Sequence, residues 1–419
     1  MELSRKNFLG FGSAAALLAV TGCRTGGAES PRGADGKVIA GFDETNAGKL
    51  ANMKWEPFSD KKVRVGIAGH GVCQFGCSFG YQNHPNVEVV ACTDLDPERC
   101  AAMQKILKAP RTFPSCEEMI KEMRGKMDAV YIATDPPSHA PLAILAMENG
   151  MHAVSAVPAF WGDHQEEFGQ KLIDTVKKTG MTYQMNETTA FRPQAFAMRA
   201  LYEGGALGKI IYTEGEYWHG ARANKGKAKA LGSYKGWRTF APPQWYCTHG
   251  NGYYNAVTHG TFTSCACLGV RTHYASKLAK IGLPGNFGNE FGFEVALLKT
   301  SDGGTARMGR CGDTPEAIQE TGRCLGTRGY YNEGYFGEAT EEELAKIVSE
   351  KPPLPPGMPA GGHGGSHGYL TDDFIRAILL GTKPVVDVYC AVNMTIPGLY
   401  MHRSATKDGE WLSIPQFTT

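Results

Sequence analysis

Two glycines between an apolar run and a mixed segment constrain the fold of this 419-residue chain most strongly. The stretch reads VRVGIAGHGVCQFG, and it places Gly69 and Gly71 as in the turn that joins a strand to a helix in doubly wound α/β proteins. Gln74 stands where such turns carry a third glycine for close packing of helix on strand. The pair alone is weak evidence, because glycines also occupy ordinary turns.

The segments around the turn strengthen that interpretation, because short β-branched runs alternate with amphipathic runs. The expected elements are a strand VRVGIA, a strand VEVVACTD, a helix from Pro97, a helix capped by Ser115 and Glu118, a strand MDAVYIAT, and a helix opened by Asp163 and Glu166 and ended by Gly180. This alternation predicts an N-terminal doubly wound parallel sheet of the Rossmann type.

Asp94 ends the second expected strand, 23 positions after Gly71. A carboxylate at that place can bind both ribose hydroxyls of a dinucleotide, and it would repel a 2′-phosphate. The residues therefore predict a nicotinamide site that uses NAD rather than NADP.

The first 23 residues have the composition of an export signal. SRKNF precedes the apolar run LGFGSAAALLAV, which is too short to span a membrane. The segment resembles a twin-arginine signal with Lys6 in place of the second arginine, so the general secretory route stays open. VTGC resembles the lipoprotein box and would make Cys23 a lipidated first residue; the alternative is a plain cleaved signal. We expect an exported periplasmic or cell-envelope lipoprotein that touches the membrane only through this anchor, with residues 24–61 as a linker.

Composition narrows the class of partner. Forty-three basic residues against 42 acidic ones give a net charge of +1, and the chain has no long run of like charges. The charge pattern therefore does not predict a positively charged surface for nucleic acid. Twelve cysteines occur without a Cys-x-x-Cys pair, mostly inside apolar stretches, and we expect mainly buried thiols and no metal site. A small molecule is the expected partner.

The order of VRVGIAGHG, ACTDLDP, DAVYIATDPPSHAPLAILAMENGMHAV and GALGKI resembles the Gfo/Idh/MocA family of sugar oxidoreductases, from about Lys62 to Thr419. The resemblance implies an NAD-binding domain at 62–186 and a substrate-binding α+β domain at 187–419, built on an open, mostly antiparallel sheet. It also implies a carbohydrate substrate, and it leaves a homo-oligomer open. The residues implied to line the cofactor are Thr134, Pro137 and His139, with Glu187 near the nicotinamide end.

One departure from that family concerns the acid/base group. Family dehydrogenases carry Glu-Lys-Pro after the fifth strand, and the lysine polarises the substrate hydroxyl, whereas this chain has Ala156 and Val157 before Pro158. Any acid or base must therefore come from the second domain.

The second domain contains GWRTFAPPQWYCTHGNGYYNAVTHG, which is dense in histidine and tyrosine. Trp-Arg followed by Tyr-x-Thr-His-Gly resembles the NAD-dependent family 109 glycoside hydrolases, and that resemblance implies a catalytic His249 with Arg238 and Tyr246 on the sugar. Phe191 replaces one family tyrosine, and Ala156 replaces an acidic residue. We expect His249 to be the principal base, because histidine titrates closest to neutrality, ahead of Tyr246, Tyr253 and His259. Tyr246 is the second catalytic candidate and Tyr253 a sugar contact.

The stretch GGHGGSHGYLTDDF holds His363 and His367 among glycines that permit close approach to a ligand. A metal pair is one interpretation, but related proteins carry a similar loop beside the substrate, so we favour sugar contact by His363. The following helix, from Tyr369 to Leu380, is expected to dock on the first domain.

Three functions remain open: a sugar dehydrogenase that exchanges hydride with free NAD, a redox-neutral enzyme such as a family 109 glycosidase, and a non-catalytic sugar-binding lipoprotein. No nicotinamide pool is expected outside the cytoplasm. Export therefore favours an enzyme that keeps NAD bound and regenerates it in a closed redox cycle.

Overall fold

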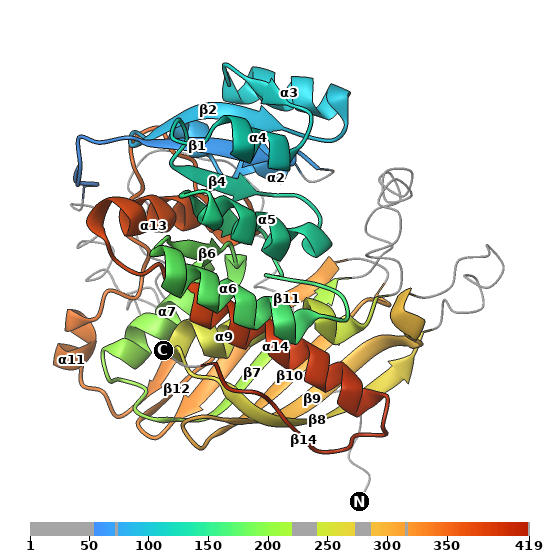
Figure 1. Ribbon diagram of the computed structural model, residues 1–419. Coiled ribbons are helices and arrows are strands. Elements are labelled where there is room, and N and C mark those ends of the chain that lie inside the picture. Colours follow the sequence, from blue (N-terminus) through green and yellow to red (C-terminus); the bar gives the residue numbers. More distant parts are fainter. Residues whose placement is uncertain (1–53, 72–73, 220–240, 273–285, 315–316, 418–419) are drawn as a thin grey trace, which may run out of the picture.

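The computed structural model describes residues 54–71, 74–219, 241–272, 286–314 and 317–417. Within these ranges the chain forms two sheets, one above the other in the view of Figure 1, with helices between and around them. The expected signal segment, Cys23 and most of the expected linker lie outside the described residues.

The first sheet has six strands among the described residues, in the order β3-β2-β1-β4-β5-β6, and all of its pairings are parallel. This is the strand order of a complete Rossmann sheet, and the order reverses between β1 and β4. The strands are β1 Val63–Ala68, β2 Val87–Thr93, β3 Thr112–Phe113, β4 Ala129–Ile132, β5 His152–Ser155 and β6 Tyr183–Met185. The expected doubly wound sheet is confirmed.

Capping residues explain where the covering helices begin and end. Asp96 caps α3 by accepting from the N–H groups of Glu98 and Arg99, and Ser115 caps α4 by accepting from the N–H of Glu118. Gly180 ends α6 in the left-handed conformation, as expected. The expected start of α6 was wrong, because His164 is its N-cap and has no side-chain cap bond. The helices are α2 Phe75–Ser78, α3 Pro97–Leu107, α4 Cys116–Glu122, α5 Pro136–Glu148 and α6 Gln165–Thr179.

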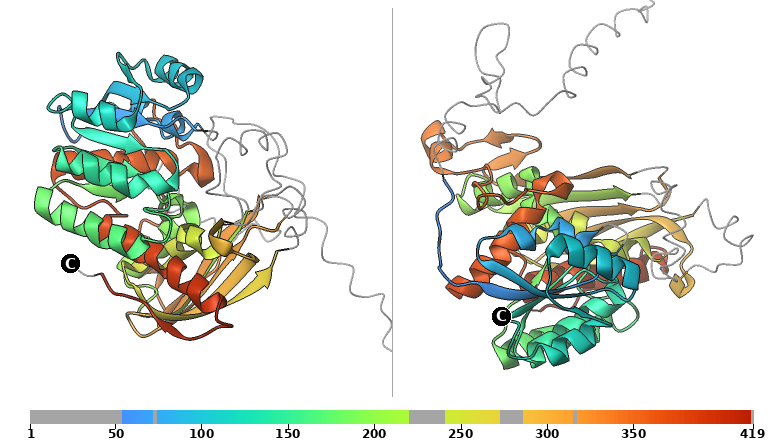
Figure 2. Two further views of the ribbon diagram at one scale, coloured as in Figure 1. Left: turned by 45° about the vertical axis from the view of Figure 1, so that its right-hand side comes forward. Right: turned by 90° about the horizontal axis from the view of Figure 1, so that it is seen from above.

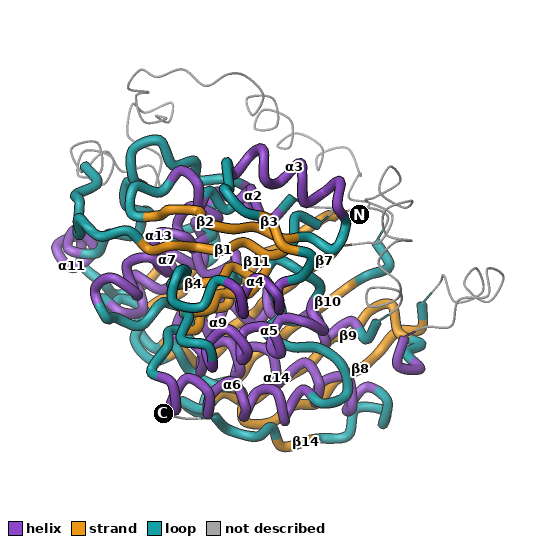
Figure 3. Tube along the Cα trace, turned by 45° about the horizontal axis from the view of Figure 1, so that its top comes forward, coloured by secondary structure: helices purple, strands orange, loops and turns teal. Residues whose placement is uncertain are grey.

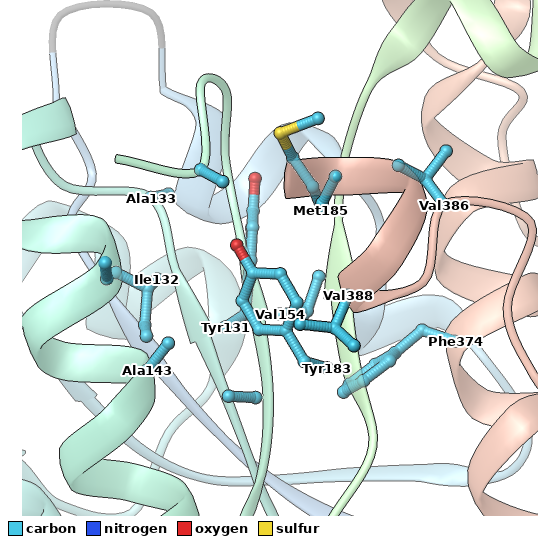
Figure 4. Close-up of a cluster of buried hydrophobic side chains, with 14 of the residues drawn as sticks. Tyr131, Ile132, Ala133, Ala143, Val154, Tyr183, Met185, Phe374, Val386 and Val388 are labelled. Atoms are coloured by element: carbon cyan, nitrogen blue, oxygen red, sulfur yellow. The ribbon is translucent and has the colours of Figure 1, made fainter. Parts of the chain in front are cut away.

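The core of the first domain lies on both faces of the sheet. Every residue of β4 is buried, which is typical of a parallel strand covered by helices on both sides. Figure 4 shows Ala143 of α5 on one side of the strands and Phe374 of a much later helix, α13 (His367–Leu380), on the other. Burial of a side chain such as Phe374 stabilises the fold by about 1.5–3 kcal/mol.

The second sheet has eight strands among the described residues, in the order β13-β12-β11-β7-β10-β9-β8-β14. All of its pairings are antiparallel except β7 with β10. Figure 3 shows the strands of both sheets in orange. The strands are β7 Ile210–His219, β8 Phe262–Arg271, β9 Phe291–Thr300, β10 Thr305–Cys311, β11 Ala317–Gly326, β12 Gly329–Tyr331, β13 Tyr335–Gly337 and β14 Leu412–Ser413. The expected mostly antiparallel second sheet is confirmed.

Helices fill the space between the two sheets (Figures 1 and 2). α9 (Thr248–Thr258) packs on β7, and α14 (Val388–Ala405) packs on β8 and on α6. The remaining helices are η2 Tyr81–Asn83, η3 Thr188–Phe191, α7 Pro193–Glu203, η5 Pro243–Tyr246, η6 Asn286–Gly288, α11 Glu341–Lys346 and α12 Gly362–Gly365.

α13 belongs to the end of the chain but packs on the first sheet. The Thr371 hydroxyl donates to the Phe79 carbonyl at 2.8 Å, and the Gln184 amide donates to the Leu370 carbonyl at 2.9 Å. The first sheet is therefore completed by a helix from the C-terminal third of the sequence.

The described cysteines are free thiols, and all except Cys311 are buried, as expected. Among the described residues, no helix combines the length and apolar character that a membrane span requires.

Candidate active site

The glycine turn, residues 69–76, follows β1 at the point where the strand order reverses. Gly69 and Gly71 have φ values of 92° and 60°, which L-side chains rarely adopt. Gln74 also has a positive φ, 56°, and is the exposed N-cap of α2. The close contact of helix and strand is made two residues later, because a Cβ on Gly76 would lie 2.5 Å from the Gly69 carbonyl oxygen. The missing third glycine therefore does not prevent close packing of α2.

Asp94 at the end of β2 binds the same turn. Its Oδ2 accepts from the N–H of His70 at 2.8 Å and from the N–H of Gly71 at 3.3 Å. The carboxylate is partly exposed. Asp94 thus holds the turn, and its expected contact with a ribose stays a prediction.

The residues expected to line the cofactor after β4 occupy three different environments. Thr134 is half-buried, and Pro137 is exposed in the first turn of α5. His139 is 1% exposed, and its two ring nitrogens lie 2.7 Å from the Pro158 carbonyl and 3.2 Å from the Thr134 carbonyl. The His139 ring thus connects the loops after β4 and β5, and its expected place along the cofactor stays a prediction.

The loop after β5 has no ionisable side chain from Ala156 to Gly162. Val157 packs against the hydrophobic core. The first domain thus offers no proton acceptor at the place where the related dehydrogenases have a lysine.

A carboxylate and an imidazole meet beyond the end of β6. Glu187 is the N-cap of η3 and is fully buried, and its Oε1 lies 2.7 Å from Nδ1 of His249 in the first turn of α9. The same oxygen accepts from the N–H of Thr189 at 2.9 Å. Among the described residues, no hydrogen bond reaches Nε2 of His249. This arrangement orients the ring and leaves Nε2 for a ligand.

Glu320 of β11 extends this group, which we call the His249 cluster: Glu187, Thr189, Arg192, His249 and Glu320. Glu320 accepts from the Thr189 hydroxyl at 2.8 Å and forms an ion pair with Arg192 at 2.5 Å. Its Oε1 lies 3.8 Å from Nδ1 of His249.

The environment shifts the pKa values of the buried pair in opposite directions. Burial alone would raise the pKa of Glu187, but the charge and hydrogen bond of His249 outweigh it and hold this pKa at about 2. Burial opposes a charge on His249, but Glu187 and Glu320 together raise the pKa of His249 above its usual value.

A metal ion is an alternative occupant, because Glu187, His249 and Glu320 offer ligand atoms within 4.8 Å of one another. The 2.7 Å separation of His249 from Glu187 is a hydrogen-bond distance, and Arg192 already neutralises Glu320. We therefore assign these contacts to hydrogen bonding rather than to metal binding.

Tyrosines surround the His249 ring. Tyr217 of β7 lies 4.5 Å from it between ring centroids, and Tyr246 of η5 lies 5.4 Å from it. Tyr253 was expected to touch a sugar, but it is 1% exposed, and a Cβ on Gly322 would lie 2.2 Å from its ring. Tyr253 is thus a buried residue of α9 that packs against β11, and its expected contact with a sugar stays a prediction.

The loop of α12 brings His363 to the same place. Its ring is nearly parallel to that of His249, with centroids 6.4 Å apart, and Phe75 of α2 lies 5.8 Å away. His363 Nδ1 lies 2.8 Å from Nε2 of His367, which stacks on Phe79 at 4.1 Å. Two metal–nitrogen bonds would need a larger separation, so these two nitrogens share a proton rather than a metal ion. Burial lowers the pKa of His363 to about 3, helped by His249, His367 and Arg192.

The structure thus brings together Glu187, Tyr246, His249 and His363 and places the glycine turn next to them through Phe75. Arg238 lies outside the described residues. The sequence analysis missed Arg192, Tyr217 and Glu320, which lie on three separate elements and carry no motif.

Comparison with known proteins supports the assignment of the first domain as an NAD-binding domain most directly. Residues 63–187 match the model of a family described as oxidoreductase family, NAD-binding Rossmann fold. Glycosyl hydrolase family 109 protein 1 of Bacteroides fragilis is 32% identical over 170 residues, which cover 38% of this chain and 35% of that protein. The match thus spans about a third of the length of the Bacteroides relative. A glycosyl hydrolase family 109 protein of Streptomyces niveus is 26% identical over 90% of this chain and 82% of that protein.

Solved structures resemble both domains. The WlbA dehydrogenase from Bordetella pertussis, in complex with NADH and UDP-GlcNAcA, has a TM-score of 0.65 at 18% identity and covers 86% of this chain and 100% of its own. The scyllo-inositol dehydrogenase from Lactobacillus casei, with bound NAD(H) and scyllo-inositol, has a TM-score of 0.61 at 15% identity, covering 84% and 99%. These likenesses show the fold. Residues 63–187 therefore match the NAD-binding Rossmann fold of the oxidoreductase family, and the expected Gfo/Idh/MocA resemblance is confirmed.

Proposed function

We propose that this chain is an enzyme that uses tightly bound NAD to oxidise a hydroxyl of a sugar or glycoside and then returns the hydride to the sugar-derived intermediate, which regenerates the NAD in a closed redox cycle. The observation that carries the proposal is the oriented Glu187–His249 pair, 2.7 Å apart, beside the NAD-binding domain. A binding protein that had merely kept the fold would not need a buried carboxylate against an imidazole whose other nitrogen has no hydrogen-bond partner among the residues that the structure describes.

The residues of the first domain fit a dinucleotide. Gly71 has the positive φ that lets backbone approach a pyrophosphate, and Asp94 holds that backbone while remaining partly exposed. Once bound, NAD supplies the acceptor for a hydride from the sugar carbon.

The proton that leaves the hydroxyl needs a separate acceptor. His249 Nδ1 donates to Glu187, so Nε2 carries the lone pair whenever the ring is neutral. Tyr246 lies beside the same ring and is the second candidate for the proton step. We propose that His249 is the principal acid/base.

The absorbance spectrum of purified protein tests this proposal. We expect denatured protein to release one nicotinamide cofactor per chain, and an accepted sugar or methyl glycoside to produce the reduced-nicotinamide band without added NAD. Cofactor-free protein with no measurable NAD affinity would overturn the proposal.

A second function, net glycoside hydrolysis by oxidation, elimination, hydration and re-reduction, is favoured by relatives named glycosyl hydrolase family 109. In both functions the hydride taken from the sugar returns to the sugar product. Release of free sugar from a nitrophenyl glycoside distinguishes net hydrolysis from a cycle that leaves the glycosidic bond intact, such as epimerisation.

We also propose export and lipid anchoring at Cys23, which rest on residues 1–23 alone. Cys23→Ala should move the protein from the membrane fraction to the soluble fraction. Folded export with NAD already bound would account for a twin-arginine type of signal.

A homo-oligomer is a further proposal. Large apolar side chains of the second sheet are exposed, and exposed apolar surface is common at protein interfaces. They include Leu268, Val270, Leu297 and Leu325. Light scattering of the purified protein measures the oligomeric state directly.

A further inference from the structure

We propose that His363 presents an unprotonated Nε2 to the substrate and therefore selects a sugar that offers a hydroxyl or amide hydrogen there. His367 is the positioning residue that imposes this state. The inference rests on the proposed function and adds to it a requirement on the substrate.

The argument begins at the first domain. His367 is buried, its ring stacks on Phe79, and its Nδ1 lies 3.2 Å from the carbonyl oxygen of Ser78 in α2. The N–H of Gly362 also points to this nitrogen, at 3.3 Å. One ring nitrogen cannot both donate to the carbonyl and accept from the N–H, so the two contacts define two alternative tautomers.

Exposure favours the contact with Ser78. Gly362 is exposed, so water can satisfy its N–H when His367 does not, whereas Ser78 is half-buried and its carbonyl oxygen relies more on the imidazole. Leaving a partly buried acceptor unpaired costs more than leaving an exposed donor to water. We therefore assign the proton to Nδ1 of His367, which leaves its Nε2 as an acceptor.

His363 must then be the donor in the 2.8 Å bond between the two rings. Its Nδ1 carries a proton, and its Nε2 carries the lone pair as long as the ring is neutral. Burial, His249, His367 and Arg192 keep the pKa of His363 at about 3, with Glu187 opposing them, so the ring is neutral at physiological pH.

Backbone strain supports a functional role for this geometry. His363 has a φ of 52°, in the left-handed region, which costs a residue with a side chain about 1–2 kcal/mol. Lys351 holds the loop in place by donating to the carbonyls of Gly364 and Gly365 at 3.1 and 2.7 Å. Strain kept in place by such anchors is typical of binding sites.

The consequence is a substrate requirement. An Nε2 lone pair accepts from a sugar O–H or an acetamido N–H, and it repels a carboxylate, a phosphate or an ether oxygen. Loss of one such hydrogen bond leaves a polar nitrogen unpaired, which costs about 1–3 kcal/mol, or about 5- to 150-fold. His363 and His249 then contact adjacent parts of one sugar, His363 as a fixed acceptor and His249 as the group that exchanges a proton.

Nitrogen-15 NMR of histidine-labelled protein without substrate tests the assignment independently of activity. His363→Gln identifies the His363 signals. We expect His363 to be neutral, with a proton on Nδ1 and none on Nε2, from pH 6 to 8. A proton on Nε2 of His363 would overturn the inference even if the protein oxidises sugars.

Variants of His367 separate positioning from folding. His367→Gln keeps an oxygen that can accept from His363, and we expect it to preserve the Nδ1–H tautomer, whereas His367→Phe keeps the stacking and should let both tautomers of His363 form. His164→Gln, at an exposed histidine, is the matched control. An unchanged His363 tautomer in His367→Phe would remove the role assigned to His367.

Substrate analogues test the predicted selection. The probes are methyl glycosides of glucose, galactose and their N-acetylamino forms, together with monodeoxy versions of whichever reduces the bound NAD. With the wild-type protein, we expect one deoxy analogue to have a kcat/KM that is about 5- to 150-fold below that of its parent glycoside. With His363→Leu, we expect the parent glycoside and this analogue to have nearly equal kcat/KM values. Equal losses in both proteins would overturn the selection by His363. If no glycoside reduces bound NAD, the proposed function fails, and the NMR result still decides the tautomer.

Discussion

The glycine turn and the His249 cluster are both candidate binding regions, but they differ in how far apart their residues lie in the sequence. The glycine turn and Asp94 lie within one strand–helix–strand unit, so a short window of sequence contains their whole geometry. The His249 cluster takes residues from η3, α9 and β11, up to 133 positions apart between Glu187 and Glu320. The difference teaches that a backbone-binding site is readable from local spacing, whereas a proton-transfer site depends on how distant elements pack.

The largest expected effect separates the two regions functionally. His249→Ala should retain bound NAD but reduce turnover on an accepted glycoside by about 100- to 10,000-fold, since it removes a positioned acid/base. His249→Gln is the companion variant, because its amide can still donate to the buried Glu187. Steady-state rate and cofactor content are measured together. A variant within a few-fold of wild type, or one that fails only by losing NAD, would move the role elsewhere.

In the glycine turn we expect a substitution to abolish NAD binding, whereas the His249 variants should keep their NAD. Gly71→Val places a side chain where the pyrophosphate must approach and adds strain at a φ of 60°. The purified variant should release almost no nicotinamide cofactor on denaturation. Retention of a full equivalent of NAD would contradict the assignment of this turn.

A pH profile sharpens the account of the His249 cluster. A base acts only when neutral, so wild-type kcat/KM should rise with pH through the pKa of His249, which Glu187 and Glu320 raise above 6.5 against the effect of burial. Glu187→Gln removes one of these charges, so the midpoint should move to lower pH. Glu167→Gln, at an exposed carboxylate, is the control. A midpoint that does not move would exclude His249 as the titrating group.

Asp94 gives a smaller effect on cofactor binding. Asp94→Ala removes an acceptor from the turn and the charge that repels a 2′-phosphate, so NAD affinity should fall by about 10- to 100-fold and the preference over NADP should shrink. Asp94→Asn keeps an oxygen for the N–H groups and should lose mainly the preference. Titration of cofactor-free protein with both dinucleotides measures the two constants, and unchanged values for both would refute the assignment.

The smallest effects compare two positions of the same turn. Gly76→Ala should destabilise the fold by about 1–3 kcal/mol, because its Cβ would lie 2.5 Å from the Gly69 carbonyl oxygen. Gln74→Gly should change the free energy of unfolding by no more than about 1 kcal/mol. Glycine removes the strain of the left-handed conformation in the folded state, but it also increases the conformational entropy of the unfolded chain, and the two effects oppose each other. Chemical denaturation measures both. A larger loss in Gln74→Gly would show that the close packing depends on residue 74.

The sequence by itself determined the Rossmann domain, because its strands, caps and glycine turn are local patterns that need no distant partner. It also indicated His249, through a motif that begins before η5 and ends in α9, and predicted the docking of α13 from that helix's apolar face. Tertiary structure alone decided the rest. Tyr253 and His139 have the chemistry of site residues, but packing buried both, and sequence spacing does not encode burial between separate elements. Glu320 and Arg192 belong to the His249 cluster because the fold places β11 against η3. A hydrogen bond needs two groups within about 3 Å, and a single sequence does not show which distant residues come that close.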